Sequence, residues 1–277
     1  MAPGEAWAVV AAFALMALSN GLAMRKAFGG KDNKQISDEN PTYVTPDGAT
    51  FSIWGFIYLF EMLLVMAQLY PSESANGLLA SRCPLTGLKV RERLVLVFCL
   101  NGVWLPVFNN ERFWAALAIM ATYLAVLLSV YSDVNAGTTE GALETVAFAT
   151  GIAMNTSWIV VALLVTVFFC GALVGWKDQH GVAGSVLAAI GAAATVAAIG
   201  WDRVMRGGDF AWAFAAAWAL RGIFRMQTIP DKARFPISAM SKNLGHTARV
   251  GSWVVVAGMA AKALSCIVQD RSPVGGA

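Results

Sequence analysis

An aromatic and acidic face on an apolar segment is the first chemical signal in this sequence. Trp54, Tyr58 and Glu61 lie at i, i+4 and i+7 in the apolar run that follows Pro46. On a helix, this spacing places the three side chains on one face. A carboxyl group at membrane depth is costly unless it faces protein or a cavity. The pattern therefore predicts a helix face that looks inward and carries polar chemistry.

Polar and tryptophan side chains recur at helical spacing in three further segments: Asn101, Trp104 and Phe108 in the first, Asn155 and Trp158 in the second, and Trp218 and Arg221 in the third. Tryptophan also anchors helices at membrane interfaces, and this explanation stays open for each tryptophan taken alone. Indole, phenol and amide groups that converge inside an apolar bundle describe a pocket for a flat, mostly apolar ligand.

The carboxyl group of Glu61 has two possible roles. It either pairs with Arg221 or Arg225 on a neighbouring helix, or it serves a ligand or a proton. An unpaired carboxylate in hydrocarbon costs roughly a few kcal/mol or more. We therefore expect Glu61 to be protonated, hydrogen-bonded or matched to a cation, with Arg221 as the first candidate partner.

The composition indicates a membrane protein. Of the 277 residues, 57% are hydrophobic and 13% are charged, against roughly 25% charged in a soluble domain. Apolar runs of about 20 residues recur, each long enough to cross a hydrocarbon core of about 30 Å. The net charge of +3 is small and spread over loops, so no nucleic-acid partner is indicated. Four cysteines without C-x-x-C spacing and two loop histidines indicate no metal site and no disulfide framework.

We expect an all-α, polytopic transmembrane bundle of about eight spanning helices, at roughly 6–24, 51–70, 94–109, 113–131, 143–174, 182–201, 209–226 and 247–268. The loops between the first three segments are long enough for local structure. The sixth segment is rich in small residues, which allow close helix contact. We expect it to pack outside the ligand pocket through a face formed by Gly184, Ala188, Gly191 and Ala192.

Several of these residues fall in motifs that resemble the TspO/MBR family, the tryptophan-rich sensory proteins that include the translocator protein. The resembling pieces are Pro46-x7-Trp54-x3-Tyr58, Asn101-x2-Trp104-x3-Phe108, Ser157-Trp158-Ile-Val-Val-Ala162 and, as in a longer subgroup, Trp218-Ala-Leu-Arg-Gly222-Ile. The resemblance covers about residues 6–175, with only the last piece beyond. The chain departs from the family pattern in lacking a proline before Trp158 and in carrying Thr166 where an asparagine is usual.

The resemblance implies a five-helix bundle over 1–175, followed by three additional helices and a polar loop over 176–277. It also implies a cavity that binds porphyrins, haem, sterols or related hydrophobic molecules. The candidate ligand-binding residues are Trp54, Tyr58, Glu61, Asn101, Trp104, Phe108 and Trp158. No catalytic residue and no required cofactor are expected, with haem, porphyrin or another pigment as possible ligands.

Two functions follow as hypotheses. The first is a binding or transport protein for tetrapyrroles or other lipophilic ligands, including sterol-like ones, in a bacterial inner membrane or a mitochondrial or plastid membrane. The alternative is an accessory subunit of a large photosynthetic or respiratory complex, whose pocket is vestigial or filled by lipid or pigment. Membrane lipids are partners in both cases, and a homodimer fits either hypothesis.

Overall fold

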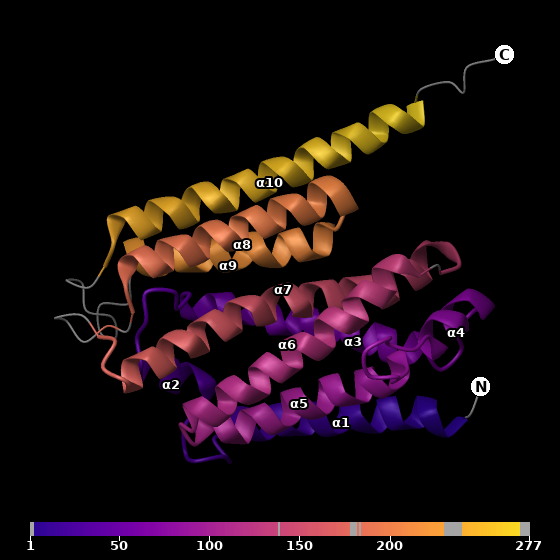
Figure 1. Cartoon of the computed structure of the whole chain (residues 1–277), viewed down its shortest axis with the longest axis horizontal. Coiled ribbons are helices and arrows are strands. Elements are labelled where there is room, and N and C mark those ends of the chain that lie inside the picture. The colour runs from indigo at the N-terminus through magenta and orange to yellow at the C-terminus, as the bar shows by residue number, and fades with distance from the viewer. Residues whose placement is uncertain (1–2, 138, 178–181, 183, 230–239, 272–277) are drawn as a thin grey trace.

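The structure, a computed structural model, describes residues 3–137, 139–177, 182, 184–229 and 240–271. The regular elements within these residues are all helices (Figure 1): α1 Pro3–Met24, α2 Asn33–Glu39, the 3-10 helix η1 Gly48–Ser52, α3 Ile53–Ala67, α4 Glu73–Ala80, α5 Val90–Asn109, α6 Phe113–Ala136, α7 Gly141–Leu173, α8 Val186–Gly207, α9 Phe210–Thr228 and α10 Lys242–Arg271.

Eight long helices match the eight expected segments. Six of them are long and apolar enough to cross a membrane: α1, α3 together with η1, α6, α7, α8 and α10. The other two, α5 and α9, have 20 and 19 residues and pack between these helices. The chain is therefore an all-helical, polytopic integral membrane protein, as its composition predicts.

Helix α5 begins four residues before its expected start and takes charged residues into the bundle. Glu92 accepts a hydrogen bond from the Lys89 backbone amide at 2.7 Å, which caps the helix start. Arg93, which is buried, forms an ion pair with Asp133 of α6. Because these charges are satisfied within the protein, hydropathy alone places the start of the helix too late.

The first five long helices form one bundle. Helix α5 packs against α1 and α6, α6 packs against α7, and α7 packs against α3 (Figure 1). The main apolar core runs through all five, and Ile57, Phe98, Tyr123 and Ile152 are among its buried members. The two short helices, α2 and α4, are not among the five helices of the bundle. Helix α2 contacts α5 at one end.

The last three long helices form a layer on top of this bundle, and α9 joins it to α7 (Figure 1). A tight turn connects α8 to α9. Gly208 ends α8 in the left-handed region at φ 65°, and the Asp209 side chain caps α9 by accepting from the Trp212 amide at 2.8 Å. The buried Ser157 of α7 donates to the Trp212 carbonyl at 3.0 Å across the α7–α9 contact.

The small-residue face of α8 differs from the expected one. Ala188 and Gly191 are exposed, so this face does not pack against the rest of the chain, and its packing against another subunit stays a prediction. The buried stripe passes instead through Ala193, Ala197 and Gly200, and it faces α9 and α10. Small residues allow close approach here within the added layer, and Gly184, which precedes α8, packs against Phe168 of α7.

Candidate functional site

A partly open cavity lies at one end of the five-helix bundle, between α2, α3, α5 and α7. Four of the candidate residues line it: Trp54 of α3, Trp104 and Phe108 of α5, and Trp158 of α7. The cavity holds about 50 Å³, which is small beside the 300–1,000 Å³ of typical ligand pockets. The sequence therefore predicts these four positions as cavity-lining, and the structure brings them together.

The cavity walls consist of two groups of packed aromatic rings. On one side, the Trp158 ring forms T-shaped contacts with Phe51 and Trp54, with centroid distances of 5.9 and 6.3 Å. On the other side, Trp104 stacks on Phe108 at 4.5 Å. Such ring pairs add directional stabilisation beyond the burial of apolar area. The site thus offers flat apolar walls to a ligand.

The thirteen lining residues are all uncharged, and two of them carry a buried polar atom that has no hydrogen-bond partner among the described residues. These atoms are the indole Nε1 of Trp104, a donor, and Oδ1 of Asn33, an acceptor. A buried polar group without a partner costs roughly 1–3 kcal/mol, so each such group favours a ligand that satisfies it. The cavity therefore suits a mostly apolar ligand with a small number of hydrogen-bonding groups.

Helix α2 covers one end of the cavity. Its Asn33 and Ser37 line the cavity, and its Ile36 is fully buried in a second apolar cluster that includes Phe108 and Phe169. These residues lie in the loop that was expected only to have local structure, so the sequence analysis missed them. In so short a segment, one apolar residue between polar neighbours is only a weak indication of a helix that packs on the bundle.

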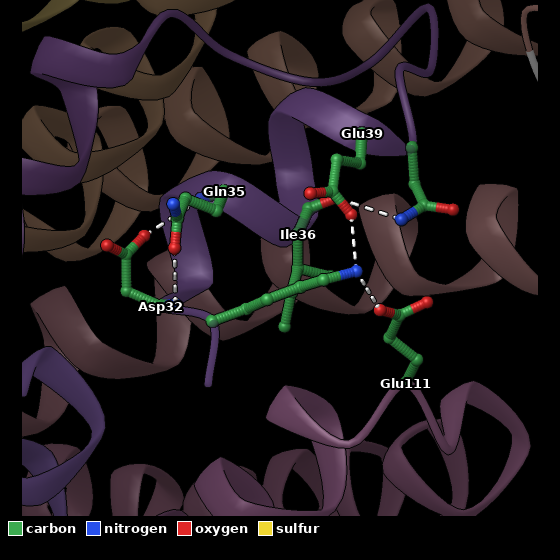
Figure 2. A network of polar contacts seen from close by, with 7 residues as sticks. Asp32, Gln35, Ile36, Glu39 and Glu111 are labelled. Atoms are coloured by element: carbon green, nitrogen blue, oxygen red, sulfur yellow. Dashed lines mark hydrogen bonds and ion pairs between the residues drawn. The ribbon is translucent and has the colours of Figure 1, made fainter. Parts of the chain in front are cut away.

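Ion pairs hold α2 in place on the outside. Asp32 caps the helix, and Lys31 donates to Glu39 at 2.6 Å and to Glu111 in the α5–α6 turn at 2.5 Å (Figure 2). These bonds, with that to Glu111 the stronger, raise the pKa of Lys31 to about 12. Lys31 therefore stays charged at physiological pH, and it links α2 to the end of α5.

The remaining candidates, Tyr58, Glu61 and Asn101, do not line the cavity. Tyr58 donates to Asn20 of α1 at 2.8 Å, and Asn20 donates to Asn101 of α5 at 3.2 Å. Asn101 in turn donates to the hydroxyl of Tyr123 in α6 at 3.3 Å. These three candidates therefore belong to a buried hydrogen-bonded network beside the cavity.

Asn155 of α7 completes this network. Its Nδ2 donates to the Tyr123 hydroxyl at 2.6 Å and to Oε1 of Glu61 at 2.5 Å. Each of the five bundle helices thus contributes at least one polar side chain. The sequence analysis missed Asn20 and Tyr123, although a polar residue inside a spanning helix is a signal for such a role.

The expected ion pair of Glu61 is wrong. Arg221 is exposed and lies over the Phe224 ring at 5.4 Å, and Arg225 pairs with Asp47 at 3.0 Å. These arginines lie on α9, which contacts α3 less than it contacts α7. The second expectation holds, because the carboxyl of Glu61 is hydrogen-bonded by Asn155.

Helix α9 holds the segment 43–52, which leads into α3 and contributes Pro46 and Phe51 to the cavity. Trp218 Nε1 donates to the Thr50 carbonyl at 2.8 Å, and the Asp47 amide donates to the Gly222 carbonyl at 3.1 Å. A Cβ at Gly222 would come within 2.1 Å of the Thr50 hydroxyl oxygen. The Trp-Ala-Leu-Arg-Gly-Ile piece thus supports the cavity from outside.

The two departures from the family pattern both lie on α7. Gly151 lies where α7 touches α3, near the position of the absent proline. Thr166 lines the cavity, but its hydroxyl donates to the Ala162 carbonyl at 2.8 Å within the helix. The hydroxyl is therefore occupied by the helix backbone in this structure.

Among known protein families, the one described as TSPO-like protein matches residues 6–261 of this chain. The match extends well beyond residue 175, where the motif resemblance was expected to end apart from one short piece. It includes α8 and α9 and most of α10. The chain has no match among the curated proteins or among the solved structures.

Proposed function

The chain belongs to the family of TSPO-like proteins, and from this premise we propose that it binds or transports flat lipophilic molecules of the tetrapyrrole class. The ligand lies between the aromatic walls of the cavity, and the protein acts as a binding protein and not as an enzyme. The membrane it occupies is bacterial, mitochondrial or plastid.

The observation that carries this proposal is the convergence of three tryptophans from three helices on one uncharged cavity. Trp54, Trp104 and Trp158 present indole faces and edges to the same space. A conjugated macrocycle gains area burial and ring stacking from such walls. The Nε1–H of Trp104, which has no partner in the part of the chain that the structure describes, can donate to a carbonyl or carboxylate oxygen of the ligand.

The size of the cavity sets a condition on binding. A tetrapyrrole is much larger than the space of about 50 Å³, so side chains must move before it binds. Helix α2 is the element best placed to move, because it is seven residues long and is held outside by ion pairs. Exposed ion pairs contribute little stability each. We therefore expect displacement of α2 to accompany binding.

The small volume also favours the alternative function to some degree. An accessory subunit of a photosynthetic or respiratory complex needs no open pocket, and a lipid chain or a packed aromatic core suffices there. The added layer of α8, α9 and α10 gives such a subunit a second outer surface. A ligand titration separates the two functions.

The test is a titration of the purified protein in detergent with protoporphyrin IX and with haem, followed by quenching of tryptophan fluorescence. Replacement Trp104→Phe keeps a ring but removes the N–H, so we expect affinity to fall roughly two- to tenfold. The matched control is Trp253→Phe, at a tryptophan of α10 that is 60% exposed. No saturable quenching by either compound contradicts the proposal and favours the accessory subunit.

A further inference from the structure

Glu61 and Asn155 leave two polar atoms without partners at the centre of the bundle. Both side chains have no exposed surface. Oε1 of Glu61 and Nδ2 of Asn155 bond to each other, whereas Oε2 of Glu61 and Oδ1 of Asn155 have no hydrogen-bond partner in the described part of the chain. A buried polar atom is costly if nothing satisfies it. A contact that served only to join α3 to α7 would not need two such atoms.

The surroundings of Glu61 decide which of its oxygens carries a proton. The side chain bonded to it is Asn155, an amide without charge. A carboxylate buried beside neutral partners is strongly disfavoured, so the group is the neutral acid. Because Oε1 accepts from Asn155 Nδ2, Oε1 is the carbonyl oxygen and Oε2 carries the proton. The pair therefore presents an O–H donor from Glu61 and a C=O acceptor from Asn155.

A hydroxyl group has the donor and the acceptor that these two atoms lack. Its oxygen accepts the proton of Glu61 Oε2–H, and its own hydrogen donates to Asn155 Oδ1. An ether or ketone oxygen satisfies only the first atom, and an N–H group satisfies only the second. The two free atoms therefore select an alcohol over these other groups.

This pair lies next to the cavity. Asn155 precedes Trp158 by three residues on α7, and one helical turn is about 5.4 Å long. Trp54 lies between the cavity and the network, since it lines the cavity and stacks on Tyr58 of the network at 5.2 Å. Trp158 is nearly fully buried, but Trp54 is only partly buried. A rotation of Trp54 is therefore the simplest way to connect the cavity with the free atoms.

We propose that Glu61 and Asn155 form a hydroxyl-binding subsite below the aromatic cavity, which holds the polar end of an otherwise apolar ligand. This inference rests on the proposed binding function and adds to it the chemical class of the ligand. The ligand has a flat apolar body between the tryptophans and an alcohol on an arm of about one helical turn.

The experiment uses two probes that differ by one hydroxyl group. Pyrenebutanol and butylpyrene share a flat fluorescent body and a four-carbon arm, and energy transfer from tryptophan reports their binding. The measured quantity is the ratio of their two dissociation constants in the purified full-length protein. Comparing this ratio between variants removes the effect of probe partitioning into detergent.

Two variants remove the subsite, and two serve as controls. Glu61→Met and Asn155→Leu keep the approximate side-chain size, and we expect each to reduce the preference for the alcohol roughly fivefold to tenfold. Glu61→Gln offers an amide N–H in place of the acid O–H, so most of the preference returns. Thr156→Val alters a buried neighbour whose hydroxyl bonds within α7, and it leaves the preference unchanged.

The outcomes separate this inference from the proposed function. If both probes bind and their ratio is the same in Glu61→Met as in the wild-type protein, the subsite is overturned while the cavity stands, and a trapped water accounts for the free atoms. If neither probe binds, the subsite inference fails, and the titration with protoporphyrin IX and haem decides the binding function separately. Should Asn155→Leu not fold, the comparison of Glu61→Met with Glu61→Gln decides the question alone.

Discussion

Gly151 of α7 lies directly against the backbone of Glu61 in α3. A Cβ at position 151 would come within 2.9 Å of the Glu61 amide nitrogen and within 2.9 Å of the Phe60 carbonyl carbon. Real side chains essentially never approach backbone this closely, so one helix would have to shift. The absent side chain at Gly151 thus allows Glu61 to reach Asn155, one turn further along α7.

The first prediction concerns this contact. Replacement Gly151→Ala should destabilise the protein by about 1–3 kcal/mol through the forced separation of α3 and α7. Alanine also improves helix propensity by about 1 kcal/mol, which offsets part of the loss. Thermal unfolding in detergent measures the effect. The control is Gly191→Ala on α8, where a Cβ meets nothing within 4 Å, and an equal loss there would contradict the prediction.

The second prediction concerns the contact between α9 and the segment 43–52. Replacement Gly222→Ala should displace Thr50, because the new Cβ would overlap its hydroxyl and methyl groups. We expect lower thermal stability and weaker probe binding, since Phe51 follows Thr50 and lines the cavity. A double variant with Thr50→Gly should recover part of the stability, whereas strictly additive losses would show that the two residues do not interact.

The third prediction isolates one hydrogen bond of the same contact. Trp218→Phe removes the Nε1–H that donates to the Thr50 carbonyl at 2.8 Å, and it keeps an aromatic ring in place. Loss of a hydrogen bond of this kind costs about 0.5–1.5 kcal/mol. Chemical unfolding of Trp218→Phe, compared with that of Trp201→Phe on α8, gives the difference. Equal stability of the two variants would mean that this bond contributes nothing.

The fourth prediction concerns the ion pairs of Lys31 that hold α2. Lys31→Met should speed amide exchange in α2 roughly two- to fivefold, because it frees Glu39 and Glu111. Lys34→Met is the matched control, since Lys34 pairs with Asp38 within the same helix. Hydrogen exchange followed by mass spectrometry measures both, and faster exchange in the control alone would contradict the assignment.

The pH dependence of the Lys31 ion pairs follows from the raised pKa of Lys31. The pKa of Lys31 in the folded protein, about 12, lies above the ordinary value of 10.5. The stabilisation by the Lys31 ion pairs is therefore fully present below about pH 10.5. It weakens as the pH rises through about 12. The contribution of Lys31 to α2 protection should therefore be constant between pH 6 and pH 9.

The sequence predicts the helices well and their contacts less well. Eight apolar runs give eight long helices because each must satisfy its backbone within itself in the membrane. Trp54, Trp104, Phe108 and Trp158 line one cavity, as their spacing predicts. A position along a helix face does not fix depth, however, and Tyr58 therefore joins the polar network and not the cavity wall.

The periodicity of the sequence does not predict which residue pairs with Glu61 or which face of α8 becomes buried. Two arginines on α9 were plausible partners for Glu61 by charge alone, but the amide of Asn155 on α7 lies nearer. On α8, alanine and glycine occur all around the helix, so composition does not select the stripe that becomes buried. In both cases, the deciding factor is which helices become neighbours.

The polar network has a mechanical consequence for the bundle. Apolar helices in lipid can slide along one another at little cost, because one methyl group replaces another at each step. Here, a shift of α1, α5 or α6 by one turn would pull Asn20, Asn101 or Tyr123 away from its partner and leave it in hydrocarbon. The network therefore fixes the axial positions of the five bundle helices relative to one another.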